Sequence, residues 1–389
     1  MKMAFLLSRF LDGGIDTVLV RYVNGLAKEG HEVTFVIANG YGNLEVYKKI
    51  VSENVKFEYL VNEGCLTAIS KKKLTRRLSS FEKFGEEAFC RPLRRLIQTW
   101  RMPKVLENQD IVIDMDCLAA SFLKRVKCPK IAFFHFSIHH YCQGRQKRIE
   151  RLGKKFRAYD KVVMVSEAMR EEAEALFPSM REKFAVIYNP QDLEEIQRRA
   201  AEYQVNAKPY ILSVARLEES QKDHTTLLKA YKIADEKRNG QMPELRIFGK
   251  GRDELKLKSL AQSLGLDGKV MFMGHSPNPL PWFLKCDAFV LSSKFEGLPV
   301  VLVESLVLSR PIVVTDCPVG PAEVLDNGGC GILVPVGDID AMADALVKIS
   351  TDKEFVQRCI ENGKVHTQKF VWEASSQKFN ALARELLNS

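Results

Sequence analysis

The sequence predicts an α/β protein made of two Rossmann-like domains that face an interdomain cleft. Three observations predict this fold class. Short β-branched and apolar runs alternate with helical patterns along the chain, which is typical of parallel sheets with crossover helices. Thirteen such runs are too many for one doubly wound sheet of about six strands. A length of 389 residues also exceeds the usual size of one hydrophobic core.

The predicted strands form two groups on either side of a polar stretch at 190–208. Seven lie in the first half, at 3–8, 32–38, 55–61, 110–116, 130–135, 161–166 and 184–189. Six lie in the second half, at 209–215, 244–249, 269–274, 288–293, 311–316 and 331–336. We therefore predict a first domain over 1–190 and a second over 191–370, with a closing helix at about 371–389 that packs back on the first domain. Ligands of such sheets bind beyond the carboxyl ends of the strands.

The composition, 46% hydrophobic and 28% charged, is that of an ordinary globular protein. No apolar run approaches the roughly 20 residues that span a bilayer, and the N-terminal apolar stretch is too short for a signal peptide and lacks a cleavage site. The nine cysteines are scattered without a C-x-x-C pair, which argues against a disulfide framework or a zinc site. We expect a protein of the reducing cytoplasm.

The net charge of +9 is concentrated in the first half. Residues 1–190 hold 33 Lys and Arg against 22 Asp and Glu, whereas the remainder holds 25 against 27. The basic clusters are Lys71 to Arg77, Arg91 to Arg95, and Arg145 to Arg157. They form either a solvated face or a site for an anionic partner. An anionic membrane surface suits helical clusters, whereas nucleic acid would require a recognised binding module, which the sequence lacks.

The most informative stretch is FEGLPVVLVE, residues 295–304. It follows a predicted strand and opens an apolar helix, with Pro299 expected at the first helical position. The backbone N–H groups of this turn, from Gly297 and Leu298 to Val300, form an anion site. Glu296 lies just before the turn, and Glu304 lies roughly 7–8 Å along a helix that is expected to be buried. This order of groups fits the sugar, diphosphate and ribose of a sugar nucleotide.

Further candidate residues follow other strands. Arg216 and Lys222 come after the first strand of the second domain, where two cations can neutralise a departing diphosphate. Gly249 and Lys250, in IFGKG, end another strand with a Gly-x-Gly that lets backbone approach a nucleotide. Gly13-Gly14 allows the same in the first domain. Surface solvation for the cations, and tight turns for the glycines, are the alternatives.

With these motifs the chain resembles the retaining, nucleotide-sugar-dependent glycosyltransferases of the GT-B fold, family 4, of the bacterial surface-glycan type. The stretches that carry the resemblance include GGIDTVLVRYVNGLAKEGHEVTFV, SVARL with QKDH, FGKG, FVLSSKFEGLPVVLVESL and PIVVTDCPVGPAEVL. It covers the second domain nearly end to end, and the first at its start and in scattered strands. It implies diphosphate binding by Arg216 and Lys222, ribose binding by Glu304 and donor-sugar contact by Glu296.

Histidine and aspartate side chains add one catalytic candidate and one competing site. His135, at the end of KIAFFH, matches a position where family members often carry a histidine near the donor sugar and the reaction centre, with a structural histidine as the alternative; His139 and His140 are weaker candidates. Asp114 and Asp116 form an Asp-x-Asp similar to the metal motif of the other large glycosyltransferase class. We favour a strand end that caps the next helix, because the two cations already supply positive charge. Asp338-Ile339-Asp340 is expected to start a helix.

The sequence thus predicts a retaining, metal-independent transferase without a cofactor. It would move a hexosyl or N-acetylhexosaminyl unit from a UDP-sugar to a lipid-linked, lipopolysaccharide or capsule-type glycan, in the cytoplasm or on the inner face of the membrane. The alternative is a UDP-sugar 2-epimerase of the same architecture, which would convert the donor without an acceptor. A nicotinamide-dependent dehydrogenase would need a complete G-x-G-x-x-G, and Glu254 stands where its third glycine belongs.

Overall fold

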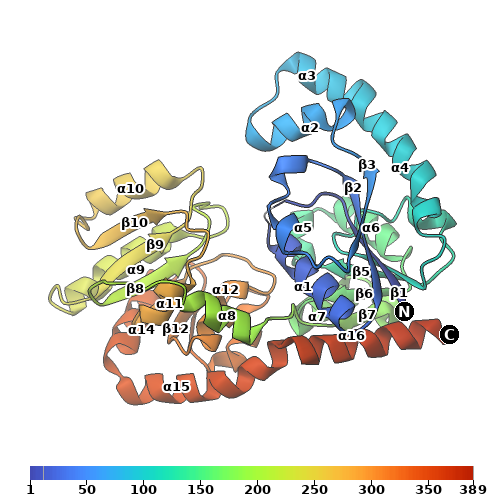
Figure 1. Ribbon diagram of the computed structural model, residues 1–389. Helices are drawn as coiled ribbons and strands as arrows, with labels where there is room; N and C mark the ends of the chain where they lie inside the picture. Colours follow the sequence, from blue (N-terminus) through green and yellow to red (C-terminus); the bar gives the residue numbers. More distant parts are fainter. Residues whose placement is uncertain (12, 389) are drawn as a thin grey trace. The chain divides into compact units, whose positions relative to one another are not determined.

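The computed structural model describes residues 1–11 and 13–388 and contains two parallel β-sheets with helices on their faces (Figure 1). The chain divides into two compact units. The first consists of Met1–Val165, Arg170–Pro190 and Ser375–Ser389, and the second of Ser166–Met169 and Gln191–Ala374. Both units have the Rossmann-like pattern that the sequence predicts. No helix of the described residues is long and apolar enough to cross a membrane.

Each predicted strand run overlaps a strand of the structure. In the first unit the strands are β1 (Lys2–Leu7), β2 (Glu32–Asn39), β3 (Lys56–Val61), β4 (Ile111–Asp114), β5 (Lys130–Phe134), β6 (Lys161–Met164) and β7 (Phe184–Val186). In the second they are β8 (Tyr210–Val214), β9 (Glu244–Phe248), β10 (Val270–Gly274), β11 (Ala288–Leu291), β12 (Ile312–Thr315) and β13 (Ile332–Val334). Most strands end one to three residues before the end of the predicted run.

Helices connect nearly all of these strands. Those of the first unit are α1 (Gly14–Lys28), α2 (Cys65–Thr75), α3 (Ser80–Gly85), α4 (Arg91–Val105), α5 (Ile138–Cys142) and α6 (Gln146–Phe156), followed by α7 (Glu167–Leu176), which begins in residues assigned to the second unit. Those of the second are α8 (Leu193–Ala200), α9 (His224–Lys237), α10 (Glu254–Ser263), α11 (Leu280–Lys285), α12 (Val300–Val307), α13 (Pro321–Val324), α14 (Ile339–Thr351) and α15 (Lys353–His366). The last helix is α16 (Trp372–Leu387). As predicted, Asp338 caps α14 by accepting a hydrogen bond from the Ala341 N–H at 2.9 Å.

Both sheets reverse their strand order once, at the first strand of the unit. The order is β3-β2-β1-β4-β5-β6-β7 in the first unit and β10-β9-β8-β11-β12-β13 in the second, with parallel pairing throughout. At such a reversal the loops leave the carboxyl ends of neighbouring strands toward opposite faces and open a crevice. The reversal points are β1 beside β4 and β8 beside β11. They are where the fold places ligand sites.

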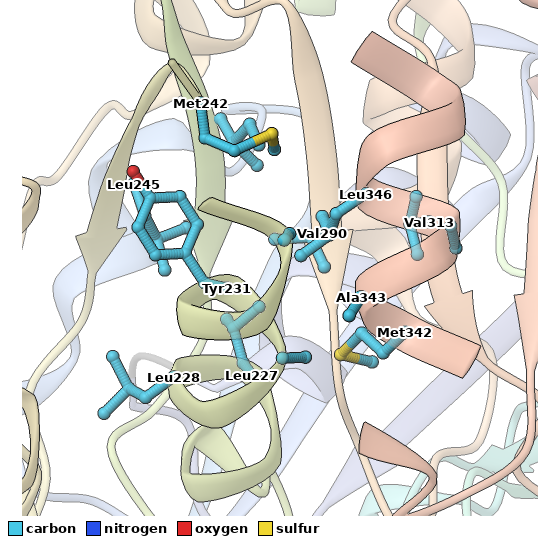
Figure 2. Close-up of a cluster of buried hydrophobic side chains, with 14 of the residues drawn as sticks. Leu227, Leu228, Tyr231, Met242, Leu245, Val290, Val313, Met342, Ala343 and Leu346 are labelled. Carbon is cyan, nitrogen blue, oxygen red and sulfur yellow. The ribbon is translucent and has the colours of Figure 1, made fainter. Parts of the chain in front are cut away.

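The core of the second unit lies between the sheet and a pair of helices. Tyr231 of α9 and Leu346 of α14 are fully buried against Val290 and Val313 of the central strands (Figure 2). Burying side chains of this kind contributes about 1.5–3 kcal/mol each relative to exposure. This core holds β8, β11 and β12 rigidly, and with them the loops that begin at their carboxyl ends.

The helix α16 completes the core of the first unit. Its Phe379 is fully buried, with ring centroids 5.7 Å from Tyr22, 6.1 Å from Phe5 and 6.4 Å from Phe133. Ser375 donates a hydrogen bond to the Tyr188 carbonyl at 3.0 Å. The helix α16 therefore packs on β1, β5 and α1 of the first unit.

Candidate active site

The loops after β8 and β11 meet at the reversal point of the second sheet. The Lys294 N–H donates to the Gln221 carbonyl at 2.7 Å, and the Ser292 hydroxyl donates to the Lys222 carbonyl at 2.8 Å. Asp223 has a left-handed backbone (φ +46°), which turns the chain into α9 directly after Lys222. These bonds bring together residues about 70 positions apart in the sequence.

Lys222 and Glu296 form an ion pair at this point. The Lys222 ammonium donates to Glu296 Oε1, and the side chains are only 12% and 8% exposed. Burying these two charges costs desolvation energy, which the attraction between them must offset. The sequence motifs predicted each residue as a separate contact to a donor. They did not predict that the two residues pair with each other. A bound diphosphate would compete with Glu296 for the ammonium.

Arg216 lies on the same loop but faces solvent. Its side chain is 65% exposed, lies 3.6 Å from the Glu218 carboxylate, and donates to Gln221 Oε1 at 2.8 Å. Gln221 in turn donates to the Phe295 carbonyl at 3.3 Å. Gln221 thus links Arg216 to the loop that carries Glu296. Sequence reasoning missed it, although its place between the two cations was a usable signal.

The Gly-x-Gly after β9 packs against the loop that carries Arg216. A Cβ on Gly249 would lie 1.9 Å from the Ala215 carbonyl oxygen, and one on Gly251 would lie 2.2 Å from that of Leu217. The Leu217 N–H donates to the Lys250 carbonyl at 3.1 Å, while the Lys250 side chain is exposed. The close approach that these glycines allow is therefore to the protein's own chain. Approach to a nucleotide stays a prediction.

The turn Gly297-Leu298-Pro299 is held by a residue that the motif does not contain. Gly320 (φ +94°) lies so close that a Cβ there would be 1.9 Å from the Gly297 carbonyl oxygen and 2.9 Å from Pro299 Cδ. Its position in PVGPAEV, just before a helix, was the available signal. Pro299 has an extended backbone (φ −71°, ψ 106°) and precedes the helix, so its predicted place at the first helical position was wrong.

The helix that follows, α12, buries Leu302, Val303 and Leu306 as expected from its apolar sequence. Glu304 is partly exposed, so the prediction that it is buried was wrong. Glu304 shares the less buried face of this helix with Val300, Val301 and Val307, which are also partly exposed. A partly exposed carboxylate on this face is accessible to a polar ligand.

The candidate glycines of the first unit lie at the start of α1, beyond the end of β1. Gly13 donates its N–H to Asp16 Oδ2 at 2.7 Å, and a Cβ there would lie 2.9 Å from the same oxygen. A Cβ on Gly14 would meet no atom within 4 Å. A side chain at Gly13 would therefore displace only the Asp16 carboxylate, whereas Gly14 borders open space into which a ligand could extend.

His135 follows β5 and is nearly buried, with 9% exposure and its ring stacked on Phe133. Burial lowers its pKa to about 4, against a smaller opposite effect of a hydrogen bond to the Met115 backbone. The imidazole is therefore neutral near pH 7. Its Nε2 is buried and has no hydrogen-bond partner among the described residues. His139 and His140 lie on α5, more exposed to solvent.

Asp114 and Asp116 hold the loop after β4. Asp114 Oδ2 accepts from the Ala119 N–H at 2.7 Å and from the Tyr159 hydroxyl, and Asp116 accepts from the N–H groups of Ser8 and Leu118. Burial, and next the charge of Asp116, raise the pKa of Asp114 to about 7. They bond loop amides rather than cap a following helix, so that prediction was wrong. Residues 1–11 and 13–388 contain no group of three or more metal-binding side chains.

The second unit places two cations, a carboxylate and the N–H groups at the start of α12 around the reversal point between β8 and β11. Cations and oriented N–H groups stabilise charge that develops on a leaving phosphate. The first unit presents a neutral imidazole and a glycine turn at the corresponding ends of its own strands. The groups of the second unit can by themselves bind a diphosphate and assist its departure.

Two family models match the chain and together span most of it. Residues 12–195 match the family described as Glycosyltransferase Family 4, and residues 195–366 match the family described as glycosyl transferases group 1. The boundary between the two matches lies close to the boundary between the two units.

Two relatives are similar to the chain over part of their length. The chain is 31% identical over 211 residues to the N-acetylgalactosamine-N,N'-diacetylbacillosaminyl-diphospho-undecaprenol 4-alpha-N-acetylgalactosaminyltransferase of Campylobacter jejuni, a match that covers 54% of this chain and 56% of the relative. It is 26% identical over 271 residues to the lipopolysaccharide 1,6-galactosyltransferase of Escherichia coli, covering 66% and 70%. The chain thus spans little more than half the length of the Campylobacter relative. Neither of the two is an epimerase.

Solved structures share the fold. HepE of Anabaena, in complex with UDP and glucose, superposes with a TM-score of 0.75 at 16% identity, covering 98% of this chain and 99% of that one. At this identity the likeness establishes the architecture alone. It agrees with the two Rossmann-like units described above.

Proposed function

The chain belongs to the GT-B glycosyltransferases of family 4, and from this we propose that it transfers a hexosyl or N-acetylhexosaminyl unit from a UDP-sugar to a glycan acceptor. The observation that carries the proposal is the meeting of Arg216, Lys222 and Glu296 with the Gly297 turn at the reversal point of the second sheet. HepE of Anabaena, which shares the fold, is described in complex with UDP and glucose, and this supports a UDP-sugar as the donor.

We assign the donor to the second unit. Arg216 and Lys222 would bind the diphosphate, the N–H groups of Leu298 and Val300 would complete the anion site, and Glu304 would bind the ribose hydroxyls. Glu296 would contact the donor sugar and hold Lys222 in place. Gly249 and Gly251 act indirectly, because they fix the backbone on either side of Arg216.

The acceptor is assigned to the first unit. The Campylobacter relative is named for an undecaprenol-linked acceptor and the Escherichia coli relative for lipopolysaccharide, which supports a lipid-linked or lipopolysaccharide-type glycan. Such an acceptor would place the enzyme at the cytoplasmic face of the membrane. Gly14 and His135 would lie beside it, with the neutral imidazole exchanging a hydrogen bond with a sugar hydroxyl.

The proposed reaction retains the anomeric configuration and needs no metal. The bond from the anomeric carbon to the β-phosphate oxygen breaks while the acceptor oxygen bonds to the same face of that carbon. The acceptor proton passes to the departing phosphate oxygen, so that UDP leaves and no protein nucleophile is consumed. The two cations stabilise the charge on the leaving group.

The test is to incubate purified protein with a panel of UDP-hexoses in EDTA, with and without membrane lipid extract, and to follow UDP release and acceptor labelling. We expect UDP release that requires the extract and persists in EDTA. Arg216→Ala and Lys222→Ala should lower the rate by about 10²–10³, whereas Lys258→Ala, at an exposed ion pair of the same unit, should leave it unchanged.

Three outcomes would contradict parts of the proposal. Conversion of the UDP-sugar without any acceptor would indicate an isomerase. Activity that is abolished by EDTA and restored by Mn²⁺ would return attention to Asp114 and Asp116. Wild-type rates in folded Arg216→Ala or Lys222→Ala would remove these cations from the site.

A further inference from the structure

One long helix of the first unit carries its large apolar side chains on the outside. The helices α3 and α4 are joined by a π-helical turn, η3 (Glu86–Cys90), and the residues at both junctions, Gly85, Glu86, Cys90 and Arg91, have helical backbone angles. The result is one continuous helix over 80–105. Its start is capped by Ser79, which accepts a hydrogen bond from the Glu82 N–H at 3.2 Å.

Six side chains of this helix form what we call the aromatic stripe. They are strongly exposed, between 46% and 85%, and comprise Phe81, Phe84, Phe89, Leu93, Leu96 and Trp100. Steps of three or four residues keep side chains on one helical face, and the single step of five crosses the π turn, which holds about one residue more than an α turn. The rings of Phe84, just before that turn, and of Phe89, within it, have centroids 6.0 Å apart. The π turn therefore keeps all six on one face.

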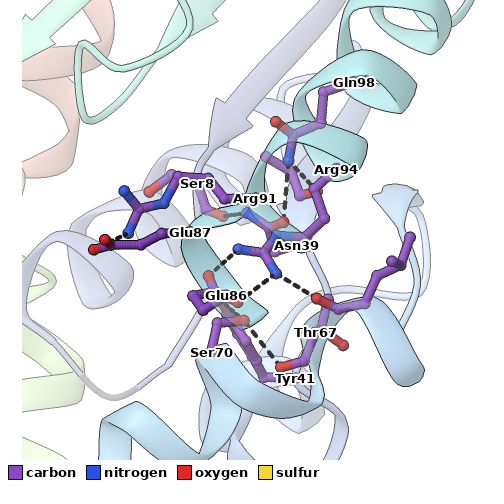
Figure 3. Close-up of polar contacts among 12 residues, drawn as sticks. Ser8, Asn39, Tyr41, Thr67, Ser70, Glu86, Glu87, Arg91, Arg94 and Gln98 are labelled. Carbon is purple, nitrogen blue, oxygen red and sulfur yellow. Dashed lines mark hydrogen bonds and ion pairs between the residues drawn. The ribbon is translucent and has the colours of Figure 1, made fainter. Parts of the chain in front are cut away.

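The opposite face of the helix is polar and points inward. Arg94 is buried with Glu86 in an ion pair and also donates to the Leu66 carbonyl (Figure 3). One turn further on, Gln98 donates to Asn39 Oδ1 at 3.0 Å. These hydrogen bonds and the buried Met102 fasten the helix to the unit, while the six exposed apolar side chains lie on the other face. An exposed apolar surface of this kind marks an interaction site.

The segment of the chain that carries the stripe is strongly cationic. Residues 71–104 contain 11 Lys and Arg against 3 Asp and Glu, a net charge of +8 in a chain whose net charge is +9. Of the three acids, Glu86 is buried with Arg94 and Glu82 is paired with Arg76. The stripe ends at Trp100, beside a hollow of about 440 Å³ whose lining includes Lys56, Arg101 and Lys104.

We propose that the aromatic stripe docks the protein on an anionic lipid bilayer. Aromatic rings are favoured at the depth of the lipid head groups, and each cation near an anionic surface adds about 1 kcal/mol of attraction. Stable membrane association needs two such signals together, and this helix supplies both. A second copy of the chain is a poorer occupant, because a twofold contact would place this cationic surface against itself.

The same helix connects the docked surface to the interior of the unit. Gln98 and Met102, on its inner face, line a small cavity of about 80 Å³ at the carboxyl ends of β1, β2 and β4, together with Ser8, Asn39 and Asp116. The cavity would lie about one helix diameter, roughly 10 Å, from the bilayer. Access of a lipid-linked acceptor to it rests on the proposed function, whereas membrane docking does not.

The experiment is flotation of the full chain with vesicles of phosphatidylcholine, with and without phosphatidylglycerol, at low and high salt. We expect binding to the anionic vesicles that weakens with salt, and a blue shift of the Trp100 emission that brominated lipids quench. The triple variant Phe84→Ser, Phe89→Ser, Trp100→Ser should bind at least about tenfold more weakly. The control is Leu255→Ser with Val365→Ser, because these apolar residues of the second unit are at least as exposed as the three replaced in the stripe.

Four results would overturn the inference: no binding of the wild type to anionic vesicles at low salt, wild-type binding by the triple variant, equal loss in the control, or self-association that only the triple variant lacks. The last would show that a second copy covers the stripe. UDP binding measured by calorimetry without vesicles reports on the proposed donor site separately. It should be the same in the triple variant and the wild type, so failure of one proposal can be told from failure of the other.

Discussion

Lys222 and Glu296 illustrate how a single pair of residues can serve both stability and binding. Each side chain is nearly buried, and each neutralises the other. A diphosphate that approached Lys222 would meet a cation already oriented by Glu296, at the cost of loosening that ion pair. The pair therefore sets the position of the ammonium and limits the gain in binding energy.

Removing one partner of this pair should destabilise the second unit. Lys222→Ala leaves the Glu296 carboxylate without its cation, which we expect to lower the free energy of unfolding by about 3 kcal/mol. The double variant Lys222→Met with Glu296→Gln should lose less, because no buried charge remains. Urea denaturation at pH 7 measures both. As a control, Lys258→Ala breaks an exposed pair and should cost less than about 1 kcal/mol; an equal loss at the two lysines would contradict the argument.

His135 should make stability depend on pH. Its pKa is lowered from 6.5 to about 4 in the folded protein, chiefly by burial. As the pH falls, the unfolded chain therefore binds a proton at this imidazole before the folded protein does. This contribution to stability is complete above pH 6.5 and is lost as the pH falls toward 4, up to on the order of 3 kcal/mol. Urea denaturation of the wild type and of His135→Gln between pH 7 and pH 4 isolates it.

The difference between those two proteins is the informative quantity. Asp114, with a pKa raised to about 7 by burial, has the opposite effect, since its contribution is present at low pH and is lost as the pH rises through 7. That effect is common to both proteins and cancels. A wild-type stability that does not fall relative to the variant below pH 6.5 would show that His135 is charged in the folded state.

Some of the site could be predicted from the sequence because its residues lie in local motifs. Arg216, Lys222 and Glu296 follow strands that their apolar runs identify, and parallel strands bring their carboxyl ends to one edge. Pairing between Lys222 and Glu296 could not be predicted, since 74 positions separate them and the strand order is not written in either motif. Gly320 was missed for the same reason, since the Gly297 turn that it contacts is distant in the sequence.

At the scale of elements, the turn after β9 positions the loop after β8. Gly249→Ala should displace that loop, because the added Cβ would lie 1.9 Å from the Ala215 carbonyl oxygen. We expect a loss of more than about 2 kcal/mol in stability and a weaker affinity for UDP. Calorimetric titration with UDP and thermal denaturation measure the two effects.

Gly268→Ala is the matched control for this variant. Gly268 also has a positive φ (+76°), but a Cβ there would meet no atom within 4 Å. Its cost is therefore backbone strain alone, about 1–2 kcal/mol, with UDP affinity unchanged. If both variants bound UDP like the wild type, the turn after β9 would have no part in positioning Arg216.

The strands were predictable as elements, whereas the long helix of the first unit was not. Each buried parallel strand is a short apolar run such as KVVM in β6, a signal that tertiary contacts reinforce. The helix over 80–105 reverses the usual pattern, with Arg94 and Gln98 inside and Phe84 outside. Its periodicity is also interrupted by the π turn. A rule that places apolar residues in the core cannot identify which face of this helix is buried.

At the scale of the whole molecule, both ends of the described chain contribute to one unit. Phe379→Ala should remove a fully buried ring from the cluster with Phe5, Tyr22 and Phe133, at a cost of about 3–5 kcal/mol. The first unit should then unfold at lower urea than the second. Hydrogen exchange resolved along the chain, with increasing urea, assigns each transition.

Leu387→Ala on the same helix is the control, because Leu387 is 39% exposed and should change stability by less than about 0.5 kcal/mol. A Phe379→Ala variant whose two units lose protection together would mean that the units unfold as one. Unchanged protection of the first unit would mean that α16 does not contribute to its core.

The return of α16 to the first unit also fixes the order in which the protein can be completed on the ribosome. Residues 375–389 are translated after every residue of the second unit, yet the first unit needs them to cover Phe5 and Tyr22. The N-terminal domain usually folds first during synthesis. Here the first unit can complete its folding only after the second unit has been translated. The nascent first unit therefore leaves Phe5 and Tyr22 without the ring of Phe379 until translation has passed the second unit.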